Sequence, residues 1–362
     1  MNTTLLSMMN EAARLTRSGD LQAATAAIQA ALVGSSTFGS TPRADGDVAR
    51  HGDKGWVIDM EPVDARSTPQ GKAYTPSPRS ELPAGGRFES GRYTDAAGSR
   101  DYKLYIPPGA GERALPLVVM LHGCTQNPDD FAAGTRMNEA ALARGFFVLY
   151  PAQSQKVNPQ RCWNWFKHSH QQRGRGEPAL LAGMTREVMS NQRIDPQRVF
   201  VAGLSAGGAM AAILGETYPE LFAAVGVHSG LAAGAASDLP SALAAMKGAG
   251  VKTRSASSGV PTIVFHGDAD TTVHPSNGEQ VIAASAGASA TVEVEPLEGR
   301  AGTRHIHRTA DHRVVAEHWV EHGAPHAWSG GSARGSFTYG RGPDASAEMV
   351  RFFLEHPRSL AH

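Results

Sequence analysis

A serine between two glycines carries the clearest chemical signal in this sequence. Residues 198–208 read RVFVAGLSAGG and contain the pattern G-x-S-x-G, with Ser205 at its centre. A short apolar strand is expected over 199–202, and a helix of small residues follows at 208–214. A strand, a sharp turn and a helix expose a serine hydroxyl at the end of a sheet, and so tight a turn leaves no room for side chains at the two glycines. The pattern predicts that Ser205 is a nucleophile.

A serine hydroxyl needs a base to take its proton, and the base needs an acid to orient it. Behind such an elbow the chain order is serine, acid, histidine. Asp268 and Asp270 compete for the acid's place, in the turn after a strand expected over 261–265. Asp270 fits the spacing H-G-x-x-D-x-x-V, and Asp268 is then a turn former. His326, in an irregular loop beyond the last expected strand, is the predicted base.

The oxyanion that forms during acyl transfer needs two N–H donors. The residue after the nucleophile, Ala206, is expected to supply one from the start of the helix. The second is expected from the loop that follows the apolar strand 115–121, where Gly123 lets the backbone turn inward. The Cys124 N–H is therefore the predicted second donor.

Composition excludes several other classes of function. The chain has 362 residues, 41% of them hydrophobic, with 34 basic and 34 acidic side chains and a pI of about 7.3. This balance does not attract nucleic acid or an anionic membrane, and no apolar run reaches the roughly 20 residues needed to span a bilayer. His305 and His307 could share one face of a strand, but without a paired carboxylate or a cysteine context no metal site is predicted. The proposed chemistry needs no metal or organic cofactor.

The chain divides into three parts by pattern. Residues 1–33 predict a helical segment, with a hairpin of two helices over 4–33, and residues 34–85 predict a low-complexity linker. The catalytic domain is expected over 86–362. No signal peptide is recognisable at the start, so a cytoplasmic location is expected, with an extracellular one as the alternative.

Strands and helices alternate within the expected catalytic domain. Strands are expected over 86–93, 100–106, 115–121, 146–150, 199–202, 223–227, 261–265, 291–295 and 313–320, and helices over 129–144, 177–191, 208–214, 276–286 and 344–355. Buried strands between helices predict a doubly wound, mostly parallel α/β sheet, and the hairpin at its start fits an α/β-hydrolase.

Five motifs in order resemble the poly(3-hydroxybutyrate) depolymerase family of esterases, which also includes feruloyl and acetylxylan esterase-like members. They are LHGCTQ (121–126), CWNWF (162–166), GLSAGGAM (203–210), HGDADTTV (266–273) and PHAWSGG (325–331). The resemblance covers roughly residues 86–356. It implies a Ser205, Asp270 and His326 triad, with oxyanion donors at Cys124 and Ala206.

Within this resemblance, two further sets of residues gain expected roles. Trp163, Trp165 and Trp328 fall in loops at the active-site end of the sheet, where they would form an apolar wall for the acyl chain. The alternative is that they are ordinary core aromatics. Cys124 and Cys162 follow neighbouring strands and would form a disulfide, with free thiols as the alternative in a reducing cytosol.

The resemblance implies a serine carboxylesterase whose partner is an ester substrate, such as a poly(3-hydroxybutyrate)-type polyester or its oligomers. A feruloyl or acetylxylan-type esterase is the alternative within the class. A peptidase of this fold would need a further specificity domain, which residues 34–85 cannot supply. In another class, residues 4–33 would anchor a protein that binds polymer granules. The sequence does not predict the oligomeric state.

Overall fold

The computed structural model describes residues 85–249, 259–287, 290–299 and 301–358. The helices expected over 4–33 lie outside this part of the chain, as does the expected linker apart from Gly85. No helix in the described ranges is long and apolar enough to cross a membrane.

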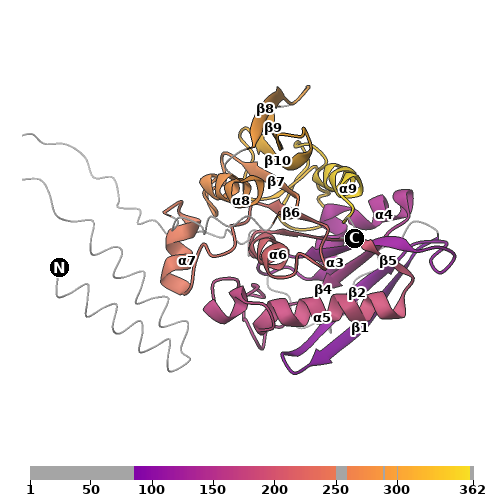
Figure 1. Ribbon diagram of the computed structural model, residues 1–362. Helices are drawn as coiled ribbons and strands as arrows, with labels where there is room; N and C mark the ends of the chain where they lie inside the picture. The colour runs from indigo at the N-terminus through magenta and orange to yellow at the C-terminus, as the bar shows by residue number, and fades with distance from the viewer. Residues whose placement is uncertain (1–84, 250–258, 288–289, 300, 359–362) are drawn as a thin grey trace, which may run out of the picture. The chain divides into compact units, whose positions relative to one another are not determined.

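The described residues build one ten-stranded mixed sheet (Figure 1). Its strands are β1 (Arg87–Asp95), β2 (Gly98–Ile106), β3 (Leu115–Leu121), β4 (Phe147–Pro151), β5 (Ile194–Leu204), β6 (Ala224–His228), β7 (Thr262–Gly267), β8 (Thr291–Pro296), β9 (Gly302–Arg308) and β10 (Val314–Glu321). They lie in the order β1-β2-β4-β3-β5-β6-β7-β10-β9-β8. The run from β4 to β10 is parallel, and both flanks are antiparallel. The expected α/β-hydrolase-like sheet is confirmed in this coarser sense: the sheet is mixed, with a parallel centre.

Helices cover both faces of the sheet and create two apolar cores. One core contains residues of α5 (Gly176–Asn191), α6 (Ala206–Thr217), α7 (Leu239–Met246) and α8 (Ser276–Ala286), and the other contains residues of α3 (Pro128–Thr135), α4 (Met137–Arg144) and α9 (Ala345–Glu355). Every residue of β3 is buried, as a strand covered on both faces requires. A short helix, η1 (His168–Gln171), and a two-stranded pair, β11 (Trp328–Ser329) and β12 (Thr338–Tyr339), lie in the connections.

Several elements differ from the sequence-based expectation, including the short η1, β11 and β12. The single helix expected over 129–144 is wrong: it is two helices, because Arg136 adopts a left-handed φ of 57° between α3 and α4. This break leaves the Thr135 carbonyl free to accept a 2.6 Å hydrogen bond from Ser346 of α9. Strand β9 and helix α7 were not expected, and Asp238 and Ser241 begin α7 with a reciprocal capping box.

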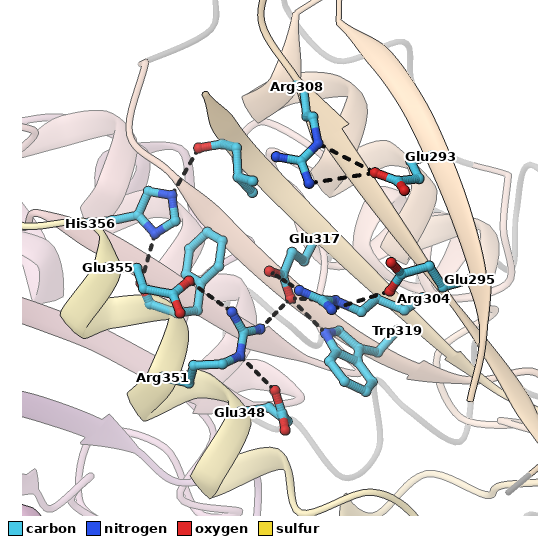
Figure 2. A network of polar contacts seen from close by, with 12 residues as sticks. Glu293, Glu295, Arg304, Arg308, Glu317, Trp319, Glu348, Arg351, Glu355 and His356 are labelled. Carbon is cyan, nitrogen blue, oxygen red and sulfur yellow. Dashed lines mark hydrogen bonds and ion pairs between the residues drawn. The ribbon is translucent and has the colours of Figure 1, made fainter. Parts of the chain in front are cut away.

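An ion-pair network fastens the β8–β9 hairpin to β10 and α9 (Figure 2). The buried carboxylate of Glu317 accepts hydrogen bonds from Arg304 at 2.7 Å and from Arg351 at 2.6 Å. Trp319 Nε1 also donates to it at 3.1 Å. Burial acts to raise the pKa of Glu317, but the two guanidinium groups outweigh burial and lower it. The network thereby fixes β10, whose following loop carries His326.

Candidate active site

Ser205 occupies a strained turn between β5 and α6. Its backbone angles are φ 57° and ψ −120°, a conformation that is unfavourable for a residue with a side chain. A Cβ at Gly203 would lie 2.3 Å from the carbonyl carbon of Gly207, so the glycines flanking the serine are required by close approach. The Ser205 N–H donates to the His228 carbonyl at 2.9 Å, which fixes the turn against the end of β6.

The predicted acid and base lie against each other. His326 Nδ1 lies 2.6 Å from Asp270 Oδ2, in a hydrogen bond that joins the loop after β10 to the turn after β7. The other carboxylate oxygen accepts the N–H groups of Thr272 at 2.9 Å and Val273 at 2.8 Å. Burial acts to raise the pKa of Asp270, but contacts with His266 and His326 outweigh it and hold the pKa below its ordinary range. Asp270 is therefore an oriented, ionised partner for the imidazole.

The competing aspartate contacts a different histidine. Asp268 is bonded to His322 Nδ1 at 2.8 Å and accepts the Gly323 N–H at 2.7 Å. Both side chains of this pair are about half exposed, whereas the Asp270 side chain is buried. The structure thus pairs Asp270, and not Asp268, with His326. Asp268 instead binds the backbone at the start of the loop that carries His326.

The loop after β3 lies beside the nucleophile, with its peptides held in place by side chains. A Cβ at Gly123 would lie 3.6 Å from Ser205 Cβ, and the Gly123 N–H donates to Gln126 Oε1 at 2.9 Å. His122 Nε2 accepts the Gln153 N–H at 3.1 Å, so its Nδ1–H donates to the Gly123 carbonyl at 2.7 Å. Burial lowers the pKa of His122 to about 4, which keeps the ring neutral.

Holding the Gly123 carbonyl also fixes the direction of the predicted oxyanion donor. The C=O and N–H of a trans peptide point in opposite directions, so the Cys124 N–H points away from the His122 ring. Ala206 is the first residue of α6, where N–H groups have no partner within the helix. The orienting roles of His122 and Gln126 were not predicted: both belong to the LHGCTQ motif, but a motif does not show which backbone groups its side chains bind.

The disulfide partners expected from the family resemblance are joined. Cys124 and Cys162 form a disulfide with a Cα–Cα distance of 4.2 Å. It connects the loop after β3 to the loop after β4. The second loop is held by the buried Glu177, which accepts the Asn164 N–H at 2.7 Å and the Asn164 Nδ2 donor at 2.8 Å. The loop that carries the predicted oxyanion donor is therefore held both by the hydrogen bonds of His122 and Gln126 and by the disulfide to a second, fixed loop.

The three tryptophans expected to line an acyl pocket lie in the interior. Trp163, Trp165 and Trp328 are 0%, 5% and 1% exposed. The Trp163 indole donates to the His122 carbonyl at 3.1 Å, and the Trp328 indole donates to Ser346 Oγ at 3.1 Å. Both indole N–H groups therefore have partners inside the protein. The structure favours the core alternative over the substrate wall for all three side chains.

A second buried histidine connects the elbow to the base loop. His228 Nε2 accepts the Ser329 N–H at 2.9 Å, while its carbonyl holds the Ser205 N–H. Its ring stacks against Phe265 and Trp328. Burial lowers the pKa of His228 well below its ordinary value, and the nearby His266 and His326 add to this effect. His228 followed a buried strand without any motif, so nothing in the sequence marked it.

The histidines singled out beyond the triad lie on the flank of the sheet. His305 and His307 are on β9, and the ring of His305 lies 6.0 Å from that of His318 on β10. Across the residues that the structure describes, no group of three or more His, Cys, Asp or Glu side chains could hold a metal ion.

Comparison with known proteins connects this geometry to one family. Residues 100–295 match the family model described as Esterase PHB depolymerase. The match includes Ser205 and Asp270 and ends before His326. Poly(3-hydroxyalkanoate) depolymerase C of Paucimonas lemoignei is 35% identical over 191 residues, covering 49% of this chain and 46% of that protein. Feruloyl esterase B of Neurospora crassa is 33% identical over 141 residues, covering 38% of this chain and 47% of that protein.

The chain thus spans about half the length of these curated relatives. Among solved structures, an acetyl xylan esterase from Aspergillus awamori superposes with a TM-score of 0.57 at 20% identity. The superposition covers 74% of this chain and 99% of that one. At this identity the likeness supports the fold alone.

Proposed function

This chain belongs to the Esterase PHB depolymerase family, and we propose that it is a serine carboxylesterase. The observation that carries the proposal is the part-buried hydrogen bond between Asp270 and His326, at the same edge of the sheet as the strained elbow of Ser205. The carboxyl ends of parallel strands meet at this edge, where α/β proteins place their ligands.

In the proposed reaction, Ser205 Oγ attacks the ester carbonyl while His326 takes the hydroxyl proton. The carbonyl oxygen gains negative charge, which the N–H groups of Cys124 and Ala206 stabilise. His326 then gives its proton to the leaving alcohol, and an acyl-enzyme remains on the serine. Water attacks the acyl-enzyme with His326 again as the base, and the acid is released.

Asp270 has a positioning and electrostatic role in this scheme. Its carboxylate accepts the His326 Nδ1–H, which leaves Nε2 as the nitrogen that exchanges the proton with the serine and the leaving group. It also stabilises the imidazolium that forms after the first proton transfer. The lowered pKa of Asp270 keeps this carboxylate ionised across the neutral range.

For the substrate, we propose the ester bonds of poly(3-hydroxybutyrate)-type polyesters or their oligomers. The name of the Paucimonas relative, a poly(3-hydroxyalkanoate) depolymerase, supports this choice. The rival substrate class is feruloyl or acetyl esters of plant cell walls, which the names of the feruloyl and acetylxylan esterase relatives support. The two classes differ in the acyl group, so acyl preference separates them.

The test compares p-nitrophenyl acetate, butyrate and ferulate with wild-type protein and the Ser205→Ala variant. Ser190→Ala is the matched control, because Ser190 is an exposed serine at the end of α5. We expect Ser205→Ala to lower kcat by about 10⁴-fold or more, as loss of a triad nucleophile does. The Ser190→Ala variant should retain the wild-type rate.

A second assay on defined 3-hydroxybutyrate oligomers and on methyl ferulate then assigns the substrate. Release of 3-hydroxybutyrate at a higher kcat/KM than ferulate supports the polyester branch, and the reverse order supports the cell-wall branch. A wild type that is inactive on every ester, or a Ser205→Ala variant that keeps the wild-type rate, contradicts the proposed function.

The disulfide favours an oxidising compartment for this protein. Disulfides persist mainly outside the reducing cytosol, so the Cys124–Cys162 bond supports the extracellular alternative over a cytoplasmic location. Fractionation of the native host, with alkylation of free thiols at the moment of lysis, tests this. Recovery of both cysteines as alkylated thiols in the cytosolic fraction would contradict it.

A further inference from the structure

Asp270 has a second histidine neighbour, which the triad chemistry does not use. His266, at the end of β7, is 1% exposed and precedes Asp270 by four residues. Its Nε2 is 2.9 Å from the Val273 carbonyl and 3.4 Å from Asp270 Oδ2. A carbonyl oxygen only accepts, so this nitrogen carries a proton, which it donates to Val273, while Asp270 Oδ2 lies in close contact with the same nitrogen. The 3.4 Å contact is longer than the bond to His326 and is the weaker of the two.

The opposite edge of the His266 ring is closely enclosed. Its Nδ1 is buried without a hydrogen-bond partner among the described residues, and so is Nε2 of His318 on β10. Both nitrogens face Gly278 of α8, where a Cβ would lie 3.0 Å from His266 Nδ1 and 2.9 Å from His318 Nε2. Glycine at this position therefore allows the two rings to approach the helix, and any side chain there would push on both.

The two other buried histidines near His266, which are His318 and His228, are held neutral. Burial lowers the pKa of His318 to about 3, with charge repulsion from His266 as the next cause. His228 on β6 is held neutral by its own burial. Asp270 is the ionised group in this surrounding, and its Oδ2 lies 3.4 Å from the Nε2 that donates to Val273. The ring is thus in contact with both the carboxylate and the turn that follows it.

We propose that His266 is a positioning residue for Asp270, whose Oδ2 it shares with His326. A carboxylate has about four lone-pair sites. Here the backbone N–H groups of Thr272 and Val273 donate to Oδ1, His326 is hydrogen-bonded to Oδ2, and His266 Nε2 lies 3.4 Å from Oδ2. Since His266 also donates to the Val273 carbonyl, it holds the turn whose N–H groups bind Oδ1, and contacts at both oxygens oppose rotation of the carboxylate away from His326. This inference rests on the proposed function, because it assigns His266 to the same triad.

Two substitutions separate this role from simple packing. His266→Leu removes the N–H, whereas His266→Gln keeps an N–H donor that reaches about as far as Nε2. We expect the leucine variant to lower kcat on p-nitrophenyl butyrate by about tenfold or more with KM within about twofold, since orientation of the triad is lost and substrate binding is not. The glutamine variant should recover kcat to within about threefold of wild type.

The pH profile gives a readout that a packing defect would not produce. In His266→Leu the carboxylate of Asp270 is held less firmly against His326, so the protonated imidazole loses part of its stabilisation. The acid limb of kcat/KM should therefore move to lower pH, by roughly half a unit, in His266→Leu and stay in place in His266→Gln. Equal losses in both variants with an unmoved limb, or a leucine variant with wild-type kcat, would overturn the proposal.

A spectroscopic measurement keeps the test independent of turnover and of the leucine variant's folding. The proton on His326 Nδ1, hydrogen-bonded to Asp270, should give a far-downfield resonance in the proton NMR spectrum. We expect it to be retained in His266→Gln and shifted or lost in His266→Asn, whose amide is too short to reach Oδ2. An identical resonance in both variants overturns the proposal. Ser205→Ala assayed in parallel shows separately whether the esterase proposal has failed.

Discussion

Gly203 and Gly207 approach each other across the turn that carries the nucleophile. A Cβ on Gly203 would lie 2.3 Å from the carbonyl carbon of Gly207, and a Cβ on Gly207 would lie 2.0 Å from the carbonyl oxygen of Leu121 on β3. Both contacts are with backbone, which cannot move aside as a flexible side chain can. The G-x-S-x-G pattern is thus explained by two steric contacts, one within the turn and one with the neighbouring strand.

The first prediction concerns the contact of Gly207 with Leu121 on β3. Gly207→Ala should lower the free energy of unfolding by about 3 kcal/mol or more, because an overpacked site against fixed backbone must distort the sheet or the turn. Esterase activity should fall together with stability. Gly340→Ala is the control, since the nearest atom to its Cβ would lie 3.5 Å away. Urea denaturation of both variants measures the difference, and a Gly207→Ala variant as stable as the control would contradict the argument.

The second prediction separates the two aspartates of the acid turn. Asp270→Asn should lower kcat by about 10⁴-fold, because an amide does not hold the imidazole in the required tautomer. Asp268→Asn removes an exposed pair with His322, which is worth about 1 kcal/mol or less, and should leave kcat within about fivefold of wild type. Steady-state kinetics on p-nitrophenyl butyrate measure both. A larger loss in Asp268→Asn than in Asp270→Asn would reverse the assignment.

The parts of the candidate site that could be predicted from the sequence are those with a local pattern. The elbow at Ser205 is marked by its strand, its glycines and its helix, so the turn and its strain follow from adjacent residues. The order of the buried strands likewise places Asp270 and His326 in loops at one edge of the sheet. Their hydrogen bond joins residues 56 positions apart, which only the folded chain shows.

The supporting residues could not be predicted because their partners are distant in the sequence. His122 binds Gln153, 31 residues away, and His228 binds Ser329, 101 residues away. Neither histidine belongs to a periodic pattern. Trp163 and Trp328 were expected to line the substrate site because their loops lie at the correct edge. Loop position does not reveal which way an indole points, and both turn inward to N–H acceptors.

The third prediction concerns the disulfide between the two loops. Cys124 and Cys162 are 38 residues apart, and a bridge that closes such a loop contributes about 2–4 kcal/mol to the free energy of unfolding. Urea denaturation with and without a phosphine reductant should show a loss of this size. The double variant Cys124→Ser/Cys162→Ser is the control and should not respond to reductant. A wild type equally stable in both conditions, with both thiols alkylated only after reduction, would contradict the estimate.

Glu177 is the buried centre of a second polar network, which is hydrogen-bonded to the loop that contains Cys162. It lies 3.3 Å from Arg100, accepts a hydrogen bond from Gln153 Nε2 at 2.5 Å and holds Asn164. Its interaction with His170, together with these hydrogen bonds, outweighs the effect of burial and lowers its pKa. A carboxyl group whose pKa is lower in the folded state stabilises the fold above its unfolded-state pKa, which is about 4.3. That contribution is lost as the pH falls from about 5 through the folded-state pKa.

The fourth prediction follows from the lowered pKa of Glu177 in the folded state. Glu177→Gln should lower the free energy of unfolding at pH 7 by about 3 kcal/mol, because the Arg100 charge remains buried without its carboxylate. The same variant should show a shallower loss of stability than wild type between about pH 5 and pH 3, since the linked proton uptake is removed. Urea denaturation across this range measures both effects. Glu216→Gln, at an exposed position of α6, is the control and should follow the wild-type curve. A Glu177→Gln variant whose stability runs parallel to wild type over the whole range would show that this carboxylate is not linked to folding.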